Sequence, residues 1–463
     1  MTRNLRAPSP GGRVKLTGSM EGRTFYEGLL EALAGGVGLA KDYLVTHSPR
    51  AAVLAYRIGL GLGLSDKELA RIFFGAILCD MGMIGLAEEA WENPEPALEP
   101  SARAEIRQHP VRSAAGAGAI PFLSGCQELI RHHHEWWDGS GYPDGLSGEA
   151  IPLGARIVRL ADTVTALGEP RPHREARSPS EIRSTIQLGS GVEFDPHLVD
   201  LWLGLEGSAV PLGVPAGHYH EIRTRAVTAI IPEVVPIASA GILMELFSSL
   251  IDAKDPYTAG HSRRVARLAG SVMGMLGEGQ DMELHARAAG HLHDLGKLSV
   301  PSRILRKPTG LCSEENLRVR RHAGDGAELL EGIPSLRSFA PACRYHHECW
   351  DGSGYPEGLR GEEIPLVARV LGICDAYDAM TSIRAYRNAL SHGWAVAEIA
   401  AHLGGQFAPV EAEAFLSLPN EVFERLHGDP GNEFDLLAVS LYAGELPADL
   451  GPTAAGNGDR QER

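Results

Sequence analysis

Two stretches of this sequence are nearly identical: HHHEWWDGSGYPDGLSGEAIPL at 132–153 and YHHECWDGSGYPEGLRGEEIPL at 345–366. The similarity extends on both sides through three further pairs of segments, which are 46–48 with 260–262, 78–82 with 292–296, and 155–162 with 368–375. Corresponding histidines and aspartates lie 213 or 214 positions apart, as His133 and His346 do. So long a match at so constant a spacing indicates that the chain is an internal duplication.

The duplication divides the chain into five segments. We expect a flexible leader at 1–20, a first copy at 21–205, a Pro/Gly-rich linker at 206–238, a second copy at 239–425, and an acidic flexible tail at 426–463. Apolar residues recur at helical spacing, as in 262–276 and 283–293, and sustained alternation is hard to find. The sequence therefore predicts an all-α fold of two tandem helical domains. The apolar run 226–237 in the linker favours one short strand.

Composition narrows the class of protein. The 463 residues include 43 basic and 59 acidic side chains, a net charge of −16, which disfavours binding to duplex nucleic acid. An anionic ligand would need metal ions or a few placed arginines. The six cysteines form no CxxC pair, and the N-terminal stretch lacks the apolar core of a secretion signal. Since the most apolar window, 226–246, is interrupted by Pro232 and Pro236, we expect no membrane span and a cytoplasmic location.

The second copy contains a set of side chains typical of a metal centre. The set comprises five histidines and two aspartates, and all but His293 recur in the first copy at the spacing of the repeat: His261, His293, Asp294, His322, His346, His347 and Asp375. Mixed imidazole and carboxylate ligands suit iron, manganese or zinc, whereas magnesium and calcium prefer oxygen ligands throughout. Any one of these histidines alone could be an ordinary surface or capping residue. The recurrence of the set favours a metal site.

Residues 255–420 resemble an HD-GYP phosphohydrolase domain, a branch of the HD superfamily. The motifs that carry the resemblance are GHS at 260–262, HDLGK at 293–297, His322, HHE at 346–348, DGSGYPEGL at 351–359, CDAYDAMTS at 374–382 and RAYR at 384–387. The resemblance implies an all-helical, metal-dependent phosphodiesterase of bacterial second-messenger signalling. Its expected substrate is cyclic di-GMP, opened to the linear dinucleotide pGpG and in part to GMP.

The same resemblance implies a role for each matching residue. His261, His293 and Asp375 would hold one divalent ion, His322, His346 and His347 a second, and Asp294 would bridge them. Two ions, iron or manganese before zinc, nickel or cobalt, are expected, because Tyr257 stands where some family members have an acidic ligand for a third. Such a pair lowers the pKa of a shared water.

The resemblance also implies the residues that contact the substrate. Asp294 and Lys297 are the expected catalytic residues, and Lys297, Arg384, Arg387 and Tyr355 the expected substrate-binding ones. Paired arginines suit phosphate because the guanidinium is a planar fork of donors. Tyr355 is expected to stack on a base or to fill its own loop. The GYP loop itself is either a docking surface for other signalling domains or a tight turn that supports the histidine pair.

The first copy has lost part of the set. It keeps His47, Asp80, His109, His133, His134 and Asp162, but Cys79 replaces the histidine of the His-Asp pair and Met83 replaces the lysine. We therefore expect a catalytically degenerate partner, which could still bind a nucleotide without turning it over. Two other functions remain open for the whole chain. One is hydrolysis of another nucleotide, such as cyclic GMP-AMP or a guanosine polyphosphate, and the other is a noncatalytic signalling scaffold.

Overall fold

The computed structural model describes residues 19–40, 44–86, 98–171, 174–205, 216–231, 238–255, 260–382 and 388–427. Within these ranges the regular elements are α-helices and short 3-10 turns. The only β-type pairings there are isolated bridges, such as Ser190 with Phe194 and Leu403 with Phe407. The predicted all-α fold is confirmed.

The two copies are built from the same series of helices. In copy one these are α2 (Leu44–Gly61), α3 (Asp66–Leu78), α5 (Pro100–Ile106), α6 (His109–Ala119), α7 (Gln127–Arg131), α8 (Leu153–Leu167), α9 (Pro179–Leu188) and α10 (Pro196–Gly204). In copy two they are α13 (His261–Leu276), α14 (Gln280–Leu292), α16 (Ser313–Arg320), α17 (His322–Gly332), α18 (Ala340–Tyr345), α19 (Leu366–Thr381), α20 (His392–Ala401) and α21 (Pro409–Leu416). The short helices α15 (Ser302–Leu305) and α22 (Asn420–His427) complete copy two. The duplication in sequence is thus a duplication in structure.

Local sequence explains where several of these helices begin. Ser65 caps α3, accepting a hydrogen bond from the Glu68 amide while the Glu68 carboxylate accepts one from the Ser65 amide. Ser178 and Glu181 form the same reciprocal cap on α9. Between α13 and α14, Gly277 and Gly279 have positive φ angles of 73° and 86°, which glycine adopts without strain. That sharp connection brings the two helices into an antiparallel pair.

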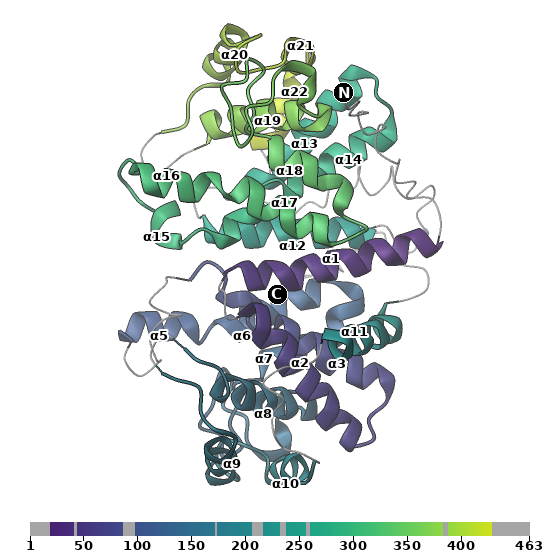
Figure 1. The fold of residues 1–463 in the computed structure, drawn as a ribbon, viewed down its shortest axis with the longest axis vertical. Coiled ribbons are helices and arrows are strands. Elements are labelled where there is room, and N and C mark those ends of the chain that lie inside the picture. Colours follow the sequence, from purple (N-terminus) through teal and green to yellow (C-terminus); the bar gives the residue numbers. More distant parts are fainter. Residues whose placement is uncertain are drawn as a thin grey trace, which may run out of the picture.

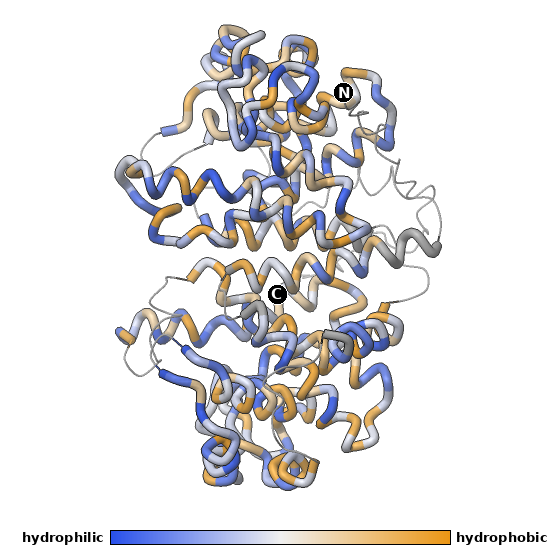
Figure 2. Tube along the Cα trace, in the orientation of Figure 1, coloured by the Kyte–Doolittle hydropathy of each residue, from blue (hydrophilic) through white to orange (hydrophobic). Residues whose placement is uncertain are grey.

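Two equivalent helices lie between the copies. Figure 1 shows α1 (Ser19–Ala40) crossing the middle of the molecule, next to α12 (Ala238–Lys254). Hydrophobic residues recur along α1 (Figure 2), and Leu29 and Leu33 are fully buried there. Although α1 opens copy one, a Cβ added at Gly36 would lie 3.1 Å from Leu298 of copy two. Leu298 belongs to the 3-10 turn η6 (Leu295–Ser299), which also carries Lys297, so copy one supports that turn directly.

The expected strand at 226–237 is wrong for its first five residues, which are helical. Helix α11 (Ala216–Ile230) lies within the segment taken as the linker and packs on α3, where Tyr219 contacts the Phe73 ring at 5.9 Å. Its apolar side chains fall at Tyr219, Ile222, Ala226 and Ile230, the spacing of one helical face. Helical periodicity therefore outweighs the β-branched composition of the run. Residues 232–237 lie outside the described residues.

No helix in the described parts of the chain combines the length and apolar character needed to cross a bilayer.

Candidate metal centre

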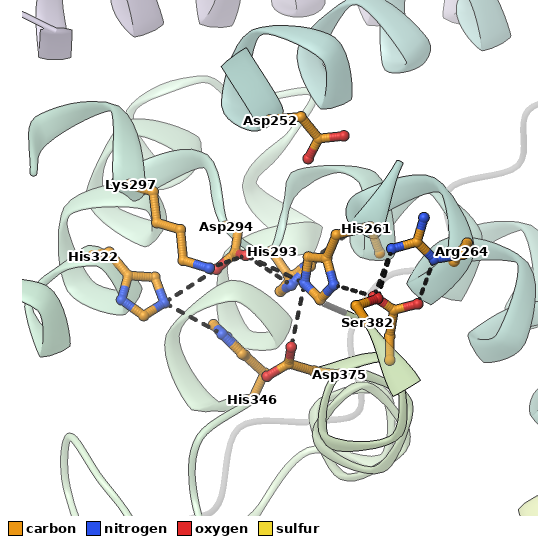
Figure 3. Close-up of polar contacts among 12 residues, drawn as sticks. Asp252, His261, Arg264, His293, Asp294, Lys297, His322, His346, Asp375 and Ser382 are labelled. Carbon is orange, nitrogen blue, oxygen red and sulfur yellow. Dashed lines mark hydrogen bonds and ion pairs between the residues drawn. The ribbon is translucent and has the colours of Figure 1, made fainter. Parts of the chain in front are cut away.

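The seven predicted ligands come together from five places in copy two. His261 is the first residue of α13, and His293 and Asp294 follow the last turn of α14. His322 is the first residue of α17, His346 and His347 follow α18, and Asp375 projects from the middle of α19. Figure 3 shows that the side chains it labels from this set point toward one another around Asp294. All five histidines lie at or just beyond helix ends. At these positions a side chain can point into the cluster without replacing an apolar residue in the buried face of a helix.

The potential ligand atoms form overlapping groups. In each group the atoms lie within 4.8 Å of one another: His261 with His293 and Asp375, His293 with Asp294 and His346, and His322 with His346 and His347. Asp294 reaches both sides, because Oδ2 is 3.3 Å from His293 Nε2 and Oδ1 is 3.3 Å from His322 Nε2. The carboxylate therefore stands between the two groups, as the bridging prediction requires.

In three of the histidines, a hydrogen bond from Nδ1 to a backbone carbonyl fixes which ring nitrogen carries the proton. The Nδ1 atoms of His293, His322 and His346 lie 2.7, 2.6 and 2.7 Å from the carbonyl oxygens of Gly290, Val319 and Cys343. A carbonyl only accepts, so Nδ1 must carry a proton, and the neutral form of each ring has its lone pair on Nε2. All three Nε2 atoms point into the cluster. This is the orientation that metal-ligating histidines adopt.

His261 is held differently, by a carboxylate that the sequence analysis did not single out. Its Nδ1 lies 2.7 Å from Asp378 Oδ2, and Arg264 Nε donates to Asp378 Oδ1 at 2.5 Å. Asp378 follows Asp375 by three positions in α19, so both carboxylates lie on the helix face toward α13. This i, i+3 spacing is the signal that could have identified Asp378.

The electrostatics of the cluster are strongly coupled. Burial opposes ionisation of Asp294, but His293 and Lys297 hold the pKa of its carboxyl well below the usual value. Burial also acts on His261, yet Asp294, Asp375 and Asp378 raise its pKa well above the usual value. Burial, together with the neighbouring imidazole of His322, lowers the pKa of His347 to about 3. Without metal ions, the carboxylates share the positive charge of His261 and Lys297.

The residues present fit a pair of ions. His261 Nε2 and His293 Nε2 are buried and make no hydrogen bond of good geometry, although polar atoms in protein interiors usually do. Their contacts are with carboxylates, His261 Nε2 lying 3.2 Å from Asp375 Oδ1 and His293 Nε2 lying 3.3 Å from Asp294 Oδ2. Both side chains are at most 1% exposed. Nitrogen lone pairs and ionised carboxylates in a closed cluster are ligands for first-row divalent metals. A group that coordinates those nitrogens would satisfy them where the protein does not.

The structure describes two of the four predicted substrate-binding residues, Lys297 and Tyr355. Lys297 Nζ lies 2.5 Å from Asp294 Oδ2 and points into the cluster. Tyr355 stacks on His347 with ring centroids 4.8 Å apart, and the Arg320 guanidinium lies 4.6 Å from the Tyr355 centroid. Arg384 and Arg387, like Tyr257, lie outside the described residues.

In the corresponding cluster of copy one, the buried histidine is paired with carboxylates of the same copy. Both ring nitrogens of His47 face carboxylates, with Nε2 2.8 Å from Asp162 and Nδ1 2.9 Å from Glu169. Burial alone would lower the pKa of His47, but these two hydrogen bonds raise it to about 9. Burial and the nearby Asp80 raise the pKa of the Cys79 thiol well above its usual value, so it is not a thiolate.

Two tandem copies of one helical fold, the second built around the His293-Asp294 pair, define the class of protein, an HD-type domain. The chain belongs to the HD domain family, whose profile matches residues 37–198 and 245–409, one match in each copy. The resemblance seen in the sequence is thereby confirmed.

Named relatives support the same grouping. The chain is 32% identical over 317 residues to 3'3'-cGAMP-specific phosphodiesterase 3 of Vibrio cholerae, covering 68% of this chain and 66% of that protein. It is 36% identical over 182 residues to a cyclic di-GMP phosphodiesterase of Thermotoga maritima, covering 39% of this chain and 50% of the relative. The chain thus spans about two thirds and one half of these proteins. A crystal structure described as a cyclic GMP-AMP specific phosphodiesterase of V. cholerae superposes with a TM-score of 0.59 at 26% identity, covering 85% of this chain and 98% of that one.

Replacement of the carboxylate behind His261 should weaken metal binding. In Asp378→Asn the amide no longer pairs as an anion with the Arg264 guanidinium and no longer fixes the His261 ring as a strong acceptor. We expect metal affinity to fall about 10- to 100-fold, the usual effect of removing such a partner. Metal content after dialysis against graded chelator measures it. Glu169→Gln, which changes the carboxylate behind His47 in copy one, is the matched control and should leave metal content unchanged; equal losses in both variants would contradict the expectation.

Proposed function

We propose that copy two is a metal-dependent phosphodiesterase that opens a cyclic dinucleotide to its linear form, with copy one as a noncatalytic partner. The observation that carries the proposal is the convergence of His261, His293, Asp294, His322, His346, His347 and Asp375 with Lys297 beside them. A pure scaffold would have no need of this arrangement. Copy one lacks the lysine and the His-Asp pair, which supports the division of roles.

Two divalent ions, iron or manganese first, are the proposed cofactors. His261, His293 and Asp375 would hold one, His322, His346 and His347 the other, and Asp294 both. When bound, such a pair supplies a Lewis acid for the phosphodiester and a nucleophile at neutral pH. The protein contributes fixed Nε2 lone pairs and a closed cluster, because its backbone carbonyls orient the rings before any ion binds.

The chain's own charged groups would position the phosphate. Lys297 is 14% exposed and its ammonium lies at the edge of the cluster, where it can donate to a phosphate oxygen while keeping its contact with Asp294. Arg384 and Arg387 are proposed as a second phosphate contact, and Tyr355 as a base contact. The GYP loop, whose Asp351 and Ser353 are exposed, is a proposed docking surface for other signalling domains. We propose a cytoplasmic location for the reaction.

Two substrates are proposed, cyclic di-GMP and 3'3'-cGAMP. The relative named for cyclic di-GMP matches 39% of the chain, about one copy. Two relatives named as 3'3'-cGAMP-specific match 68% and 75%, which takes in both copies. A third relative named as 3'3'-cGAMP-specific matches 36% of the chain, so the support for 3'3'-cGAMP as the better substrate comes from the two relatives that align with both copies.

The test is product chromatography with the full-length, metal-loaded protein and each cyclic dinucleotide in turn. We expect a linear dinucleotide from both, formed faster from 3'3'-cGAMP, and loss of product after chelation. Absence of any linear product from either compound, with metals bound, would overturn the proposal.

A further inference from the structure

Helix α13, which presents His261 to the metal cluster, takes its N-terminal cap from another helix. Its own N-cap residue is Gly260, which has no side chain to bond the first amides, and its third residue is Arg263, where a capping box has an acid. The acid comes from α12 instead, because the Gly260 amide donates to Asp252 Oδ2 at 2.6 Å. Asp252 thus acts as the carboxylate of a capping box from outside the helix that it caps.

Two carboxylates hold His261, one through the backbone and one through the ring. Asp252 bonds the amide of the residue before it, and Asp378 Oδ2 lies 2.7 Å from its Nδ1. Figure 3 shows Asp252 pointing from α12 toward the cluster, and its second oxygen, Oδ1, is buried without a hydrogen-bond partner. The single bond to the Gly260 amide is therefore what ties the end of α12 to this ligand.

Copy one contacts the residue next to Asp252. Gly85, just after the 3-10 turn η1 (Met81–Met83), has a φ of 89°, and a Cβ added there would lie 2.4 Å from the carbonyl oxygen of Ala253. Arg306 of copy two joins the same place, because its Nη2 donates to the Ala253 carbonyl at 3.2 Å and also to the Gly85 carbonyl. The end of α12 is thus enclosed between the two copies.

Copy one does not hold its own first histidine in this way. Gly38 stands at the position of Asp252, and His47 is the fourth residue of α2 instead of the first. Its ring is fixed by Asp162 and Glu169. The external cap is therefore a feature of the copy that has the proposed metal centre.

We infer that Asp252 positions His261 for metal binding, and that the contact of Gly85 with Ala253 keeps Asp252 in place. The inference rests on the proposed metal centre. Asp252 is a positioning residue, since it acts on the ligand through the backbone at the start of α13. Copy one then contributes to the activity of copy two by contact alone, without a ligand or a reaction of its own.

The first test compares Asp252→Ala with Asp252→Asn in the full-length protein. We expect the affinity for Mn²⁺, measured by calorimetry, to fall about tenfold in the alanine variant, at the low end of the range for outer partners of a metal ligand. Asparagine should restore most of it, because its side-chain oxygen can accept from the Gly260 amide. An equal loss in both variants would make Asp252 a metal ligand and overturn the positioning role. Lower thermal stability with wild-type affinity would overturn it too.

The second test places the same backbone strain inside and outside the contact between the copies. Gly63, in the turn between α2 and α3, has a φ of 71° and nothing within 4 Å of an added Cβ, so Gly63→Ala is the control for Gly85→Ala. We expect Mn²⁺ affinity to fall about 2- to 30-fold in Gly85→Ala, the range for residues that transmit coupling, and to stay unchanged in Gly63→Ala. Equal affinities would overturn the contribution of copy one.

Amide hydrogen exchange in the metal-free protein separates this inference from the proposed function. Residues 260–265 should exchange faster in Asp252→Ala than in the wild type or Asp252→Asn, because the start of α13 has lost its cap. A wild type that binds no Mn²⁺ would overturn the proposed centre itself. A wild type that binds Mn²⁺, with equal affinity and equal exchange in Asp252→Ala, would overturn only the role of Asp252.

Discussion

Replacement of the His-Asp pair by alanines, His293→Ala with Asp294→Ala, should abolish both metal binding and turnover. Asp294 lies between the two histidine groups, 3.3 Å from both His293 Nε2 and His322 Nε2. Its loss removes the carboxylate that both proposed ions share, and the loss of His293 removes a nitrogen with no other partner. Metal ions stabilise a phosphoryl transition state by several kcal/mol, so the rate of linear-product formation should fall about a thousandfold or more. Metal analysis and product chromatography on the same preparations measure both effects.

The duplication supplies the control for this experiment. Cys79 and Asp80 occupy the equivalent positions in copy one, where Cys79 is buried and the Asp80 side chain is 21% exposed. Cys79→Ala with Asp80→Ala should leave metal content and turnover near the wild-type values. If the copy-two variant retained metals and turned over substrate as fast as the copy-one variant, the assignment of the centre to copy two would be wrong.

The repeated motifs allowed most of the fold to be predicted from the sequence. Helical periodicity and the repeat together predict a series of helices in each copy, and α3 and α14 begin 214 positions apart, as the repeat requires. Helix α11 was not predicted because its β-branched residues favoured a strand and the prolines that follow it argued against a helix, whereas packing against α3 decided its structure. The position of α1 against η6 of the other copy was also out of reach, since periodicity shows that a helix has an apolar face but not what covers it.

For the candidate site, too, part could be predicted from the sequence and part could not. The seven proposed ligands could be named because each lies in a repeated motif, and the structure brings them within reach of one another. The partners that orient them are largely backbone carbonyls, such as that of Gly290 for His293, and these carry no sequence signal. The contact of Arg159 with Trp136 and Glu193 in copy one joins three residues that are far apart in the chain and that only the fold brings together.

In both copies carboxylates lie in the protein interior, where burial disfavours the ionised form unless a positive charge or a hydrogen-bond donor lies close by. In copy one the protein's own side chains pair with the carboxylates. His47 hydrogen-bonds to Asp162 and Glu169, and Arg50 donates to Glu169 at 2.9 Å. In copy two Asp378 pairs with Arg264, and Asp294 pairs with Lys297 and His293. His293 Nε2 has only its 3.3 Å ion-pair contact with Asp294 and makes no hydrogen bond of good geometry, which suits a nitrogen that coordinates a metal ion.

The second large effect should come from Lys297, which copy one replaces with the buried Met83. In Lys297→Met the side chain stays long and apolar but loses the ammonium that lies 2.5 Å from Asp294 Oδ2. Because Lys297 is not a proposed ligand, we expect both ions to remain bound. The cation would, however, no longer stabilise charge on the transferred phosphate, so kcat should fall about 10²- to 10³-fold, as it does when one preorganised donor is removed from an active site.

A catalytic role of Lys297 can be separated from a structural one by measuring metal content, kcat and KM. The proteins to compare are the wild type, Lys297→Met and Lys297→Arg. The arginine keeps the positive charge and should recover part of kcat, although its planar fork cannot reproduce the contact of a compact ammonium. If Lys297 served only to neutralise Asp294 and hold the fold, Lys297→Met would lose metals and thermal stability together. A variant with full metal content, unchanged stability and wild-type kcat would instead show that the lysine has no part in the reaction.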